Sequence, residues 1–329
     1  MKSTAVVCVE KGVVKLQEID VPDPKEHEIQ VRVHTSVISQ GTERAFILNL
    51  ENTNGVYPHF PGYCAAGVVE RTGSGVTRFQ VGDRVACIGV SHRSLGNIDE
   101  QRAVRVPAAV SFEEAAFLTM GVIAMQGVRK LRIELGESAM ILGLGLIGQL
   151  ALQFAAMNGA QPAIGVDRAE SRLLMAKASG ASSVINSSEE QWQDMLKAST
   201  QGVGPHVVIE STGFPEAIET AFDAVRKYGR VVLLGSTRGE SSINFYQYVH
   251  KKAITIIGAH APANPKFESH PGYWTWHDNA DCYMRLMESK RIQLDPLITH
   301  RVTWNQAEQI YEQILSWNSH VMGVVMNWQ

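Results

Sequence analysis

The sequence predicts an α/β protein in which a doubly wound parallel sheet is joined to a second, barrel-like antiparallel domain. The chain has 329 residues, of which 45% are hydrophobic, enough to bury two cores of ordinary size. Short β-rich runs separated by turn residues fill residues 5–110. From residue 111 to 258, nearly all-apolar strand segments alternate with helical segments, the pattern of a parallel sheet covered on both faces.

The first part of the chain is rich in strands and poor in helices. We predict strands at residues 4–10, 13–19, 28–39, 65–73 and 83–90, separated by the turn segments PDPKEHE, TGSG and VGD. The middle part begins with the strand 138–145 and continues with the helix 146–160, the strand 162–167, the helix 169–181, the strands 183–186 and 206–212, the helix 215–227 and the strands 229–235 and 253–258.

The last part of the chain does not extend the alternation. It contains a predicted helix at 281–292, a strand at 297–302, a helix at 305–317 and a closing strand at 320–328. A closing strand is easily donated back to an N-terminal barrel. We therefore predict a discontinuous domain of residues 1–118 and 259–329 around a doubly wound domain of residues 119–258.

Composition and charge exclude several classes of partner. The net charge of −3 gives no basic footprint for nucleic acid, and no apolar run approaches the roughly 20 residues of a membrane helix. The N-terminus resembles a strand rather than a signal peptide, so we expect a soluble, cytoplasmic protein that acts on a small molecule. The scattered cysteines, Cys8, Cys64, Cys87 and Cys282, predict buried free thiols rather than disulfides or a zinc lobe.

A glycine-rich turn lies where the first strand of the doubly wound domain meets its helix. Gly143, Gly145 and Gly148 form G-x-G-x-x-G, with Leu146 and Ile147 at the start of the helix. The first glycine permits a tight turn, the second lets the backbone approach a pyrophosphate, and the third lets the helix pack on the strand. The free N–H groups of the helix terminus then face the phosphates, which predicts a dinucleotide site.

An acidic residue supports this interpretation. Asp167 lies 24 residues after Gly143, at the end of the next strand, where its carboxylate can accept both ribose hydroxyls. A carboxylate repels a 2'-phosphate, which favours NAD. Arg168 and Arg172 beside it keep NADP open as the alternative cofactor, and a tight turn with a surface aspartate is the structural alternative.

Two later strand ends reach the same edge of the predicted sheet. Ligands bind at this carboxyl edge, so Ser211, Thr212, Gly235 and Ser236 are candidates to contact the cofactor, with ordinary strand-to-loop turns as the alternative.

In this order the motifs resemble those of the medium-chain dehydrogenases, whose best-known members are zinc alcohol and polyol dehydrogenases. The resemblance covers essentially the whole chain and rests on SVISQGTERA, FPGYCAAGVVERTGSGVTRFQVGDRV, GLGLIG, GVDRAESRL and LDPLITH. It implies a Rossmann domain, a discontinuous GroES-like β-barrel catalytic domain, and an oxidoreductase that acts on CH–OH groups. It also implies a homodimer or homotetramer with the segment 229–258 at the contact.

The family's catalytic zinc ligands are absent from this sequence. The resemblance places Gln40, Tyr63 and a residue near Leu118 where the family has Cys, His and a third cysteine or acid. These side chains cannot recreate a zinc site, so no zinc is expected. A displaced site built from Cys64, Glu43 and His59 is the alternative.

Without a metal, other groups must stabilise and protonate the substrate oxygen. The resemblance places Tyr63 at the zinc-binding histidine, as a donor or proton shuttle, and Thr42 at the family's relay hydroxyl. Glu43 and Gln40 are candidates to fix a substrate hydroxyl. Each has a structural alternative. Tyr63 could simply fill the cavity left by the zinc, and Glu43 could pair with Arg44 or another arginine.

Taken together, these features predict an NAD-dependent, zinc-independent dehydrogenase. The segments S-x-G-T-E-R and Gly-Tyr are similar to a subgroup with bacteriochlorophyllide hydroxyethyl dehydrogenase and bacterial sugar or cyclitol dehydrogenases, which implies a secondary alcohol on a polyol, sugar or cyclitol. The aromatic segment 260–277 is either a substrate-pocket wall or an interface or anchored loop. An NADPH-dependent enone or quinone reductase and a non-catalytic NAD(P)-binding sensor or scaffold stay open as alternatives.

Overall fold

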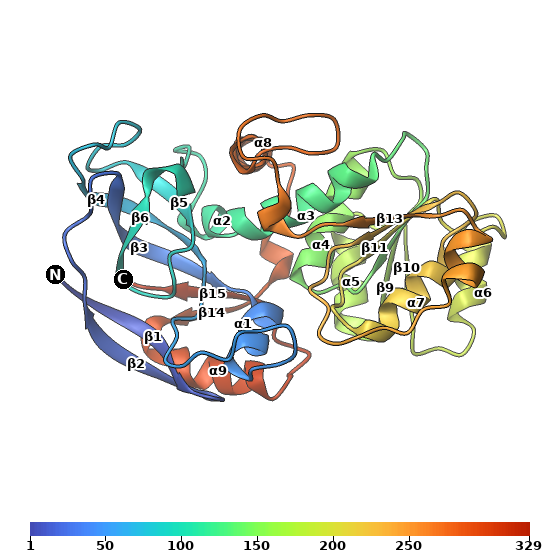
Figure 1. Ribbon diagram of the computed structural model, residues 1–329, viewed down its shortest axis with the longest axis horizontal. Helices are drawn as coiled ribbons and strands as arrows, with labels where there is room; N and C mark the ends of the chain where they lie inside the picture. Colours follow the sequence, from blue (N-terminus) through green and yellow to red (C-terminus); the bar gives the residue numbers. More distant parts are fainter. The chain divides into compact units, whose positions relative to one another are not determined.

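The computed structural model describes residues 1–329 and divides them into two compact units (Figure 1). One unit comprises Met1–Met120 and Ala280–Gln329, and the other comprises Gly121–Asn279. The first unit is therefore discontinuous in sequence. The segment 259–279, which the sequence analysis assigned to the barrel, groups with the doubly wound unit, because its aromatic side chains are anchored on a helix of that unit, as described below.

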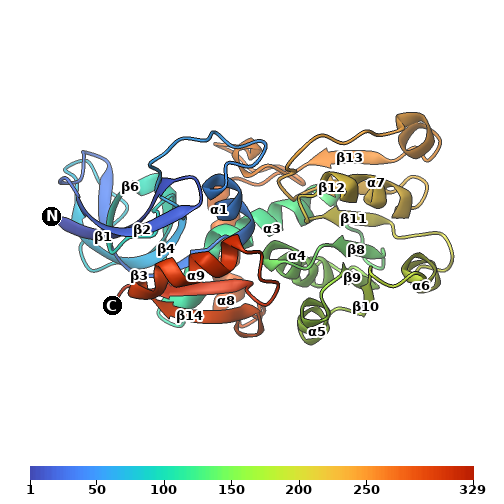
Figure 2. The same cartoon turned by 90° about the horizontal axis from the view of Figure 1, so that it is seen from below.

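The doubly wound unit contains a six-stranded parallel sheet with the strand order β10-β9-β8-β11-β12-β13 (Figure 2). Its strands are β8 (Ala139–Leu142), β9 (Ala163–Asp167), β10 (Ser183–Asn186), β11 (Val207–Glu210), β12 (Arg230–Leu233) and β13 (Thr255–Gly258). Counted along the chain, this is the order 3-2-1-4-5-6 of a dinucleotide-binding sheet. The predicted fold of this unit is confirmed.

Apolar strands explain why this sheet forms. β8 and β11 are buried along their whole length, and their side chains are almost entirely aliphatic. The helices are α3 (Leu118–Leu131), α4 (Leu146–Met157), α5 (Glu170–Ala178), α6 (Trp192–Ser199) and α7 (Pro215–Ala224). The sequence analysis did not predict α6, a short helix with the single buried residue Leu196.

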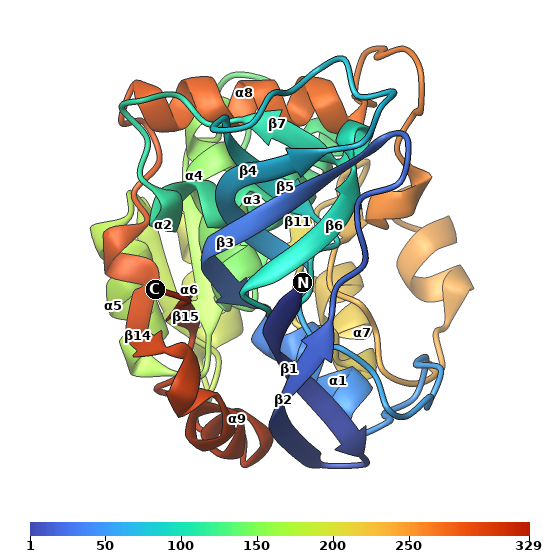
Figure 3. The same cartoon turned by 90° about the vertical axis from the view of Figure 1, so that its left-hand side faces the viewer.

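The other unit is built mainly from antiparallel strands, as the sequence predicts (Figure 3). Its sheet has the order β14-β15-β3-β4-β5-β7, β6 also pairs with β3, and β1 pairs with β2. The strands are β1 (Lys2–Glu10), β2 (Val13–Asp20), β3 (Glu28–Ile38), β4 (Cys64–Thr72), β5 (Arg84–Ile88), β6 (Leu95–Asp99), β7 (Ala103–Arg105), β14 (Ile298–Thr303) and β15 (Gly323–Asn327). The closing strand β15 returns to pair with β3, as predicted.

Three α-helices lie wholly within this unit. They are α1 (Gln40–Ile47), α2 (Phe112–Ala116) and α9 (Ala307–Leu315), and α8 (Trp276–Glu288) spans the division between the units. A capping box between Ser111 and Glu114 fixes the start of α2. α9 buries Ile310, Tyr311 and Ile314 in the core formed by the strands. None of the helices is long and apolar enough to cross a membrane.

Candidate functional site

Each glycine of the turn between β8 and α4 has its own steric reason to be glycine. Gly143 has a φ of +89°, and a Cβ there would lie 2.6 Å from the Thr212 side chain. A Cβ on Gly148 would lie 1.9 Å from the carbonyl oxygen of Gly143. A Cβ on Gly145 would meet nothing within 4 Å. The turn is therefore tightly packed except at Gly145, where open space lies against the backbone.

The open space adjoins the N-terminus of α4. Gly145 is the N-cap and no side chain caps the helix, so the first-turn N–H groups of Leu146, Ile147 and Gly148 have no partner within the helix. Leu146 and Ile147 are only half-buried. Their N–H groups and the helix dipole suit a pyrophosphate, so these residues fit the predicted dinucleotide.

Asp167 ends β9 and its carboxylate is held against the turn. Its Oδ2 atom accepts a hydrogen bond from the Leu144 N–H at 2.7 Å, and its Oδ1 atom accepts one from Ala169 N–H at 2.9 Å. Arg172 Nη1 lies 3.8 Å from Oδ2, and Arg168 is exposed. Each oxygen keeps a lone pair for a ribose hydroxyl. The structure thus brings Asp167 and Arg172 together beside the turn.

The strand end after β11 packs against the same turn. The Ser211 hydroxyl donates to the Gly143 carbonyl oxygen at 2.7 Å. The buried Glu210 carboxylate accepts from the N–H and hydroxyl groups of Thr212, and its burial raises the pKa of Glu210. A Cβ on Gly235 would lie 2.6 Å from the Gly213 nitrogen. Ser211, Thr212 and Gly235 therefore shape the turn, whereas Ser236 is exposed at its edge.

In the barrel unit, the Tyr63 phenol is held at the start of α1. It donates to Ser39 Oγ at 2.7 Å, and Thr42 lies in the first turn of the helix that follows Ser39. Burial raises the pKa of Tyr63, so the phenol stays protonated well above neutral pH. Gln40, the first residue of α1, is half-buried and takes no part in this hydrogen bonding.

Glu43 does not face a substrate as the sequence analysis expected, because its carboxylate is buried and fully engaged. Oε1 accepts from the Ser39 N–H at 2.7 Å, Oε2 accepts from the Tyr311 phenol, and His92 Nε2 lies 3.1 and 3.2 Å from the two oxygens. The side chain is 3% exposed. The structural alternative, a pairing of Glu43 with Arg44, is not formed either, since Arg44 stacks on Trp317.

Sequence reasoning missed His92 and Tyr311. They lie 49 and 268 residues from Glu43, so no local spacing links them. Gly62 gives an indirect signal of the His92 ring. Glycine is required there because φ is +93° and because a Cβ would lie 2.5 Å from that ring. A glycine directly before Tyr63 could thus have indicated a bulky side chain packed against it.

The residues at the family's zinc positions do not fit a zinc ion. No group of three or more His, Cys, Asp or Glu side chains is placed to hold a metal in residues 1–329. Cys64 is buried, its burial raises its pKa well above the usual value, and His59 instead contacts the Val56 carbonyl oxygen. The displaced site of Cys64, Glu43 and His59 is therefore not formed.

The aromatic segment after β13 is an anchored loop. Arg129 of α3 stacks over Trp274, with its guanidinium carbon 3.5 Å from the ring centroid, and Lys130 lies over Tyr273. Arg132 donates to the Pro271 carbonyl oxygen at 2.8 Å. These cation–π contacts use the faces of Trp274 and Tyr273, which favours the anchoring interpretation over a pocket wall.

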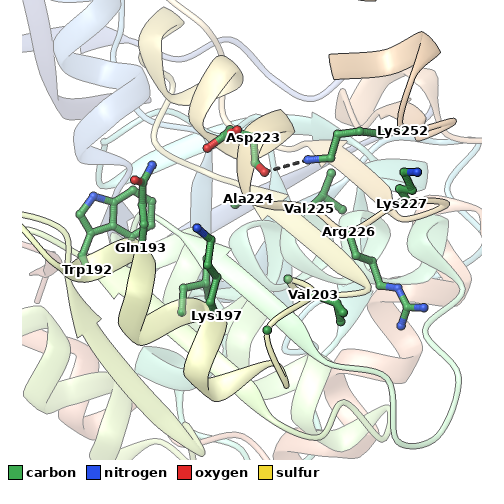
Figure 4. Close-up of a pocket in the computed structure, with 13 residues that line it drawn as sticks. Trp192, Gln193, Lys197, Val203, Asp223, Ala224, Val225, Arg226, Lys227 and Lys252 are labelled. Carbon is green, nitrogen blue, oxygen red and sulfur yellow. Dashed lines mark hydrogen bonds between the residues drawn. The ribbon is translucent and has the colours of Figure 1, made fainter. Parts of the chain in front are cut away.

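A cavity of about 250 Å³ opens elsewhere in the doubly wound unit (Figure 4). It lies beside the segments that lead into β11, β12 and β13, at the edge opposite the glycine turn. Trp192, Lys197 and Lys252 line it, and the Lys252 ammonium donates to the Asp223 carbonyl oxygen at 2.8 Å. None of the predicted site residues lines this cavity.

Comparisons with known proteins follow the same division of the chain. The family model described as "Alcohol dehydrogenase GroES-like domain" matches residues 25–124, and the model described as "Zinc-binding dehydrogenase" matches residues 147–274. L-threonine 3-dehydrogenase from Pyrococcus abyssi (strain GE5 / Orsay) is 28% identical over 329 residues, and the match covers 91% of each chain.

A second relative is similar in both sequence and fold. Galactitol 1-phosphate 5-dehydrogenase from Escherichia coli (strain K12) is 23% identical over 346 residues, with 95% of this chain and 96% of that protein covered. The crystal structure of galactitol-1-phosphate dehydrogenase from Escherichia coli has a TM-score of 0.87 and 22% identity, over 99% of this chain and 100% of the other. This structural likeness shows a shared fold.

Proposed function

Because the chain belongs to the medium-chain alcohol-dehydrogenase-like family of oxidoreductases acting on CH–OH groups, we propose that it is an NAD-dependent, zinc-independent dehydrogenase. It would interconvert a secondary alcohol and a ketone on a polyol, sugar, cyclitol or related ring. The observation that carries this proposal is the hydrogen bond from the Tyr63 phenol to Ser39, since the resemblance implies that Tyr63 stands in place of the family's zinc-binding histidine.

The bound nicotinamide supplies or accepts the hydride, and the chain's residues hold the cofactor and move the proton. Gly145 and the N-terminus of α4 bind the pyrophosphate, and Asp167 accepts the ribose hydroxyls. In ketone reduction, the Tyr63 phenol turns its hydrogen from Ser39 Oγ to the carbonyl oxygen as negative charge develops there, and the phenol oxygen regains a proton from the Ser39 hydroxyl, which solvent replenishes. In alcohol oxidation, the phenol oxygen accepts the carbinol proton as it passes its own hydrogen to Ser39 Oγ, which releases a proton to solvent.

The choice of NAD rests on the carboxylate of Asp167. This carboxylate is ordered by two backbone N–H groups and lies where a 2'-phosphate would bring a second negative charge. Fluorescence titration with NADH and NADPH tests the choice. Tighter binding of NADH supports the proposal, and tighter binding of NADPH reverses it.

A screen of substrates tests the reaction. Purified protein is assayed at 340 nm with NAD or NADP and a panel of polyols, sugars and cyclitols, and with NADH or NADPH and matching ketones. Each assay is repeated after treatment with a chelator, and a zinc-dependent dehydrogenase treated in parallel serves as the control that chelation removes zinc. We expect turnover of a ring-based secondary alcohol without added metal.

One observation favours a second candidate, the NADPH-dependent reductase of enones or quinones. The exposed Arg168 and the Arg172 guanidinium stand beside Asp167 and could hold a 2'-phosphate. Turnover of enones with NADPH but not of secondary alcohols would establish this candidate. Cofactor binding without turnover of any of these substrates would instead indicate a sensor or scaffold.

We also infer that two doubly wound units pair along β13, giving a homodimer or homotetramer. β13 lies at the end of its sheet, so one side of its backbone has no partner strand. Ile256 on this strand is 36% exposed, and nearby Phe245 and Tyr246 are each 62% exposed. An apolar sheet edge of this kind favours pairing with a second copy of the chain.

A further inference from the structure

A chain of hydrogen bonds runs through the barrel unit to the start of α1. Trp328 Nε1 lies 2.9 Å from Ser36 Oγ, which lies 2.7 Å from His92 Nδ1. The other imidazole nitrogen contacts the Glu43 carboxylate. His92 is 0% exposed and Ser36 is buried too, so no solvent interrupts this chain.

One assignment of hydrogens satisfies every member of this chain. An indole N–H can only donate, so Ser36 Oγ accepts from Trp328 and keeps its own hydrogen to donate. We assign that hydrogen to His92 Nδ1, so that the ring hydrogen lies on Nε2 and is donated to Glu43. With the neutral Nε2–H tautomer, every polar atom of the imidazole is satisfied.

Glu43 connects His92 with Ser39, whose hydroxyl group accepts from the Tyr63 phenol. Its carboxylate receives hydrogen bonds from His92, from the Tyr311 phenol and from the Ser39 N–H. Ser39 Oγ is in turn the acceptor of the Tyr63 phenol. One carboxylate oxygen thus fixes the backbone of the residue whose side chain orients the phenol.

His92 also holds the segment that carries Tyr63. The His92 N–H donates to the Pro61 carbonyl oxygen at 2.9 Å, and its ring fills the space beside Gly62. The Gly89 N–H donates to the Tyr63 carbonyl oxygen at 2.8 Å. His92 therefore contacts both sides of the Tyr63–Ser39 hydrogen bond, through its imidazole at Glu43 and through its backbone and ring packing at the segment before Tyr63.

We propose that His92 and Tyr311 are positioning residues for the Tyr63 phenol, acting through Glu43 and Ser39. This inference rests on the proposed function in one respect, that Tyr63 meets the substrate oxygen. No Lys or Arg forms an ion pair with the buried Glu43 carboxylate, so its hydrogen-bond donors replace a counter-ion. Removal of one donor should displace Ser39 and misalign the phenol.

The test compares Tyr311→Phe with Tyr283→Phe. Both tyrosines are 0% exposed, both lie in the barrel unit, and each phenol donates one hydrogen bond. Tyr311 donates to Glu43, whereas Tyr283 donates to the Glu114 carbonyl oxygen. The matched variant therefore controls for the loss of a buried phenol hydroxyl.

Tyr311→Phe is expected to lower kcat by about tenfold or more, with KM and NADH affinity within about twofold of wild type. Tyr283→Phe is expected to lower Tm by a similar amount and to leave kcat within about twofold. Equal effects of the two substitutions on kcat would overturn the positioning role. Because both substitutions are expected to lower Tm equally, a larger loss of kcat in Tyr311→Phe than in Tyr283→Phe supports the positioning role.

A spectroscopic measurement separates this inference from the proposed function. In protein labelled with 15N-histidine and 13Cζ-tyrosine, His92 should show the Nε2–H tautomer, and the Tyr63 resonance should shift in Tyr311→Phe but not in Tyr283→Phe. A charged or Nδ1–H imidazole, or a Tyr63 resonance indifferent to Tyr311→Phe, would overturn the inference. If no alcohol or ketone is turned over, the proposed function fails while these spectra still decide whether the network holds the phenol.

Discussion

At the scale of single residues, the phenol of Tyr63 combines a defined hydrogen bond with a raised pKa. Burial is the largest cause of that rise, and the hydrogen bond from the phenol to Ser39 fixes its direction. A phenol of this kind keeps its proton at neutral pH and well above it, so it can act as a donor to a substrate oxygen.

Tyr63→Phe removes the donor and keeps the ring. We expect kcat to fall by about tenfold to a thousandfold while NADH affinity is nearly unchanged, because the phenol is assigned to the substrate and not to the cofactor. Steady-state kinetics and fluorescence titration measure the two effects. Unchanged turnover would remove Tyr63 from the reaction.

The pH dependence of ketone reduction has a definite sign. The phenol is active when protonated, and its pKa is raised above the ordinary value near 10. Wild-type kcat should therefore show no loss of a protonated donor between pH 7 and about 9.5, since deprotonation occurs only at higher pH. A fall of kcat with an apparent pKa near 8 would assign the proton to another group.

Asp167 is the residue to which we assign the proposed preference for NAD. Asp167→Asn removes the negative charge and keeps an acceptor for a ribose hydroxyl, so NADH should bind more weakly and discrimination against NADPH should relax by about tenfold or more. The ratio of the two dissociation constants checks this. An unchanged ratio would contradict the assignment of Asp167 to the ribose.

At the scale of elements, the turn between β8 and α4 contains one glycine assigned to cofactor binding, Gly145, and one required for folding, Gly148. Gly145 has a φ of −67°, which alanine adopts freely, and a Cβ there would meet nothing. Gly148 has no such freedom, because a Cβ would collide with the Gly143 carbonyl oxygen at 1.9 Å. The two glycines therefore predict opposite results for the same substitution.

Gly145→Ala should leave the Tm of the cofactor-free protein unchanged and weaken NADH binding by about tenfold or more, because the new methyl group occupies the space assigned to the pyrophosphate. Gly148→Ala should lower Tm by several degrees without any cofactor present. Thermal unfolding with and without NADH checks both. Equal Tm losses in the two variants would contradict the assignment of the open space.

Much of the element pattern could be predicted because it depends on local periodicity. The apolar runs of β8 and β11 and the glycine turn after β8 are visible in the sequence. α6 was missed because it buries only Leu196. The capped helix α2 was missed because it is short and its signal is a single Ser111–Glu114 pair.

At the scale of the whole molecule, the contacts that sequence reasoning missed are those that span the chain. Glu43 was identified as a site residue, but its role changed once His92 and Tyr311 were seen to surround it. These partners approach only because β15 and α9 pack with β3, β4 and α1 in one core. Such contacts between distant segments depend on tertiary packing, which residue spacing does not encode.

The exposed edge at β13 leads to a prediction about assembly. Ile256→Lys places a charge on that edge, so we expect the variant to be monomeric while the wild type is a dimer or tetramer. Light scattering after size-exclusion chromatography measures the masses. Leu174→Lys is the matched control, because Leu174 is an exposed leucine on α5 (59%) of the same unit and away from the strand edge. A monomeric wild type at micromolar concentration would contradict the inferred pairing.

The central claim is that this chain carries out hydride transfer without zinc. The direct measurement is the turnover of protein dialysed against a chelator, with its metal content determined on the same sample. We predict full activity at less than about 0.1 zinc per chain, since no three side chains are placed to hold the ion. Loss of activity on chelation that is restored by one equivalent of zinc would contradict the account and require a metal site that includes Cys64.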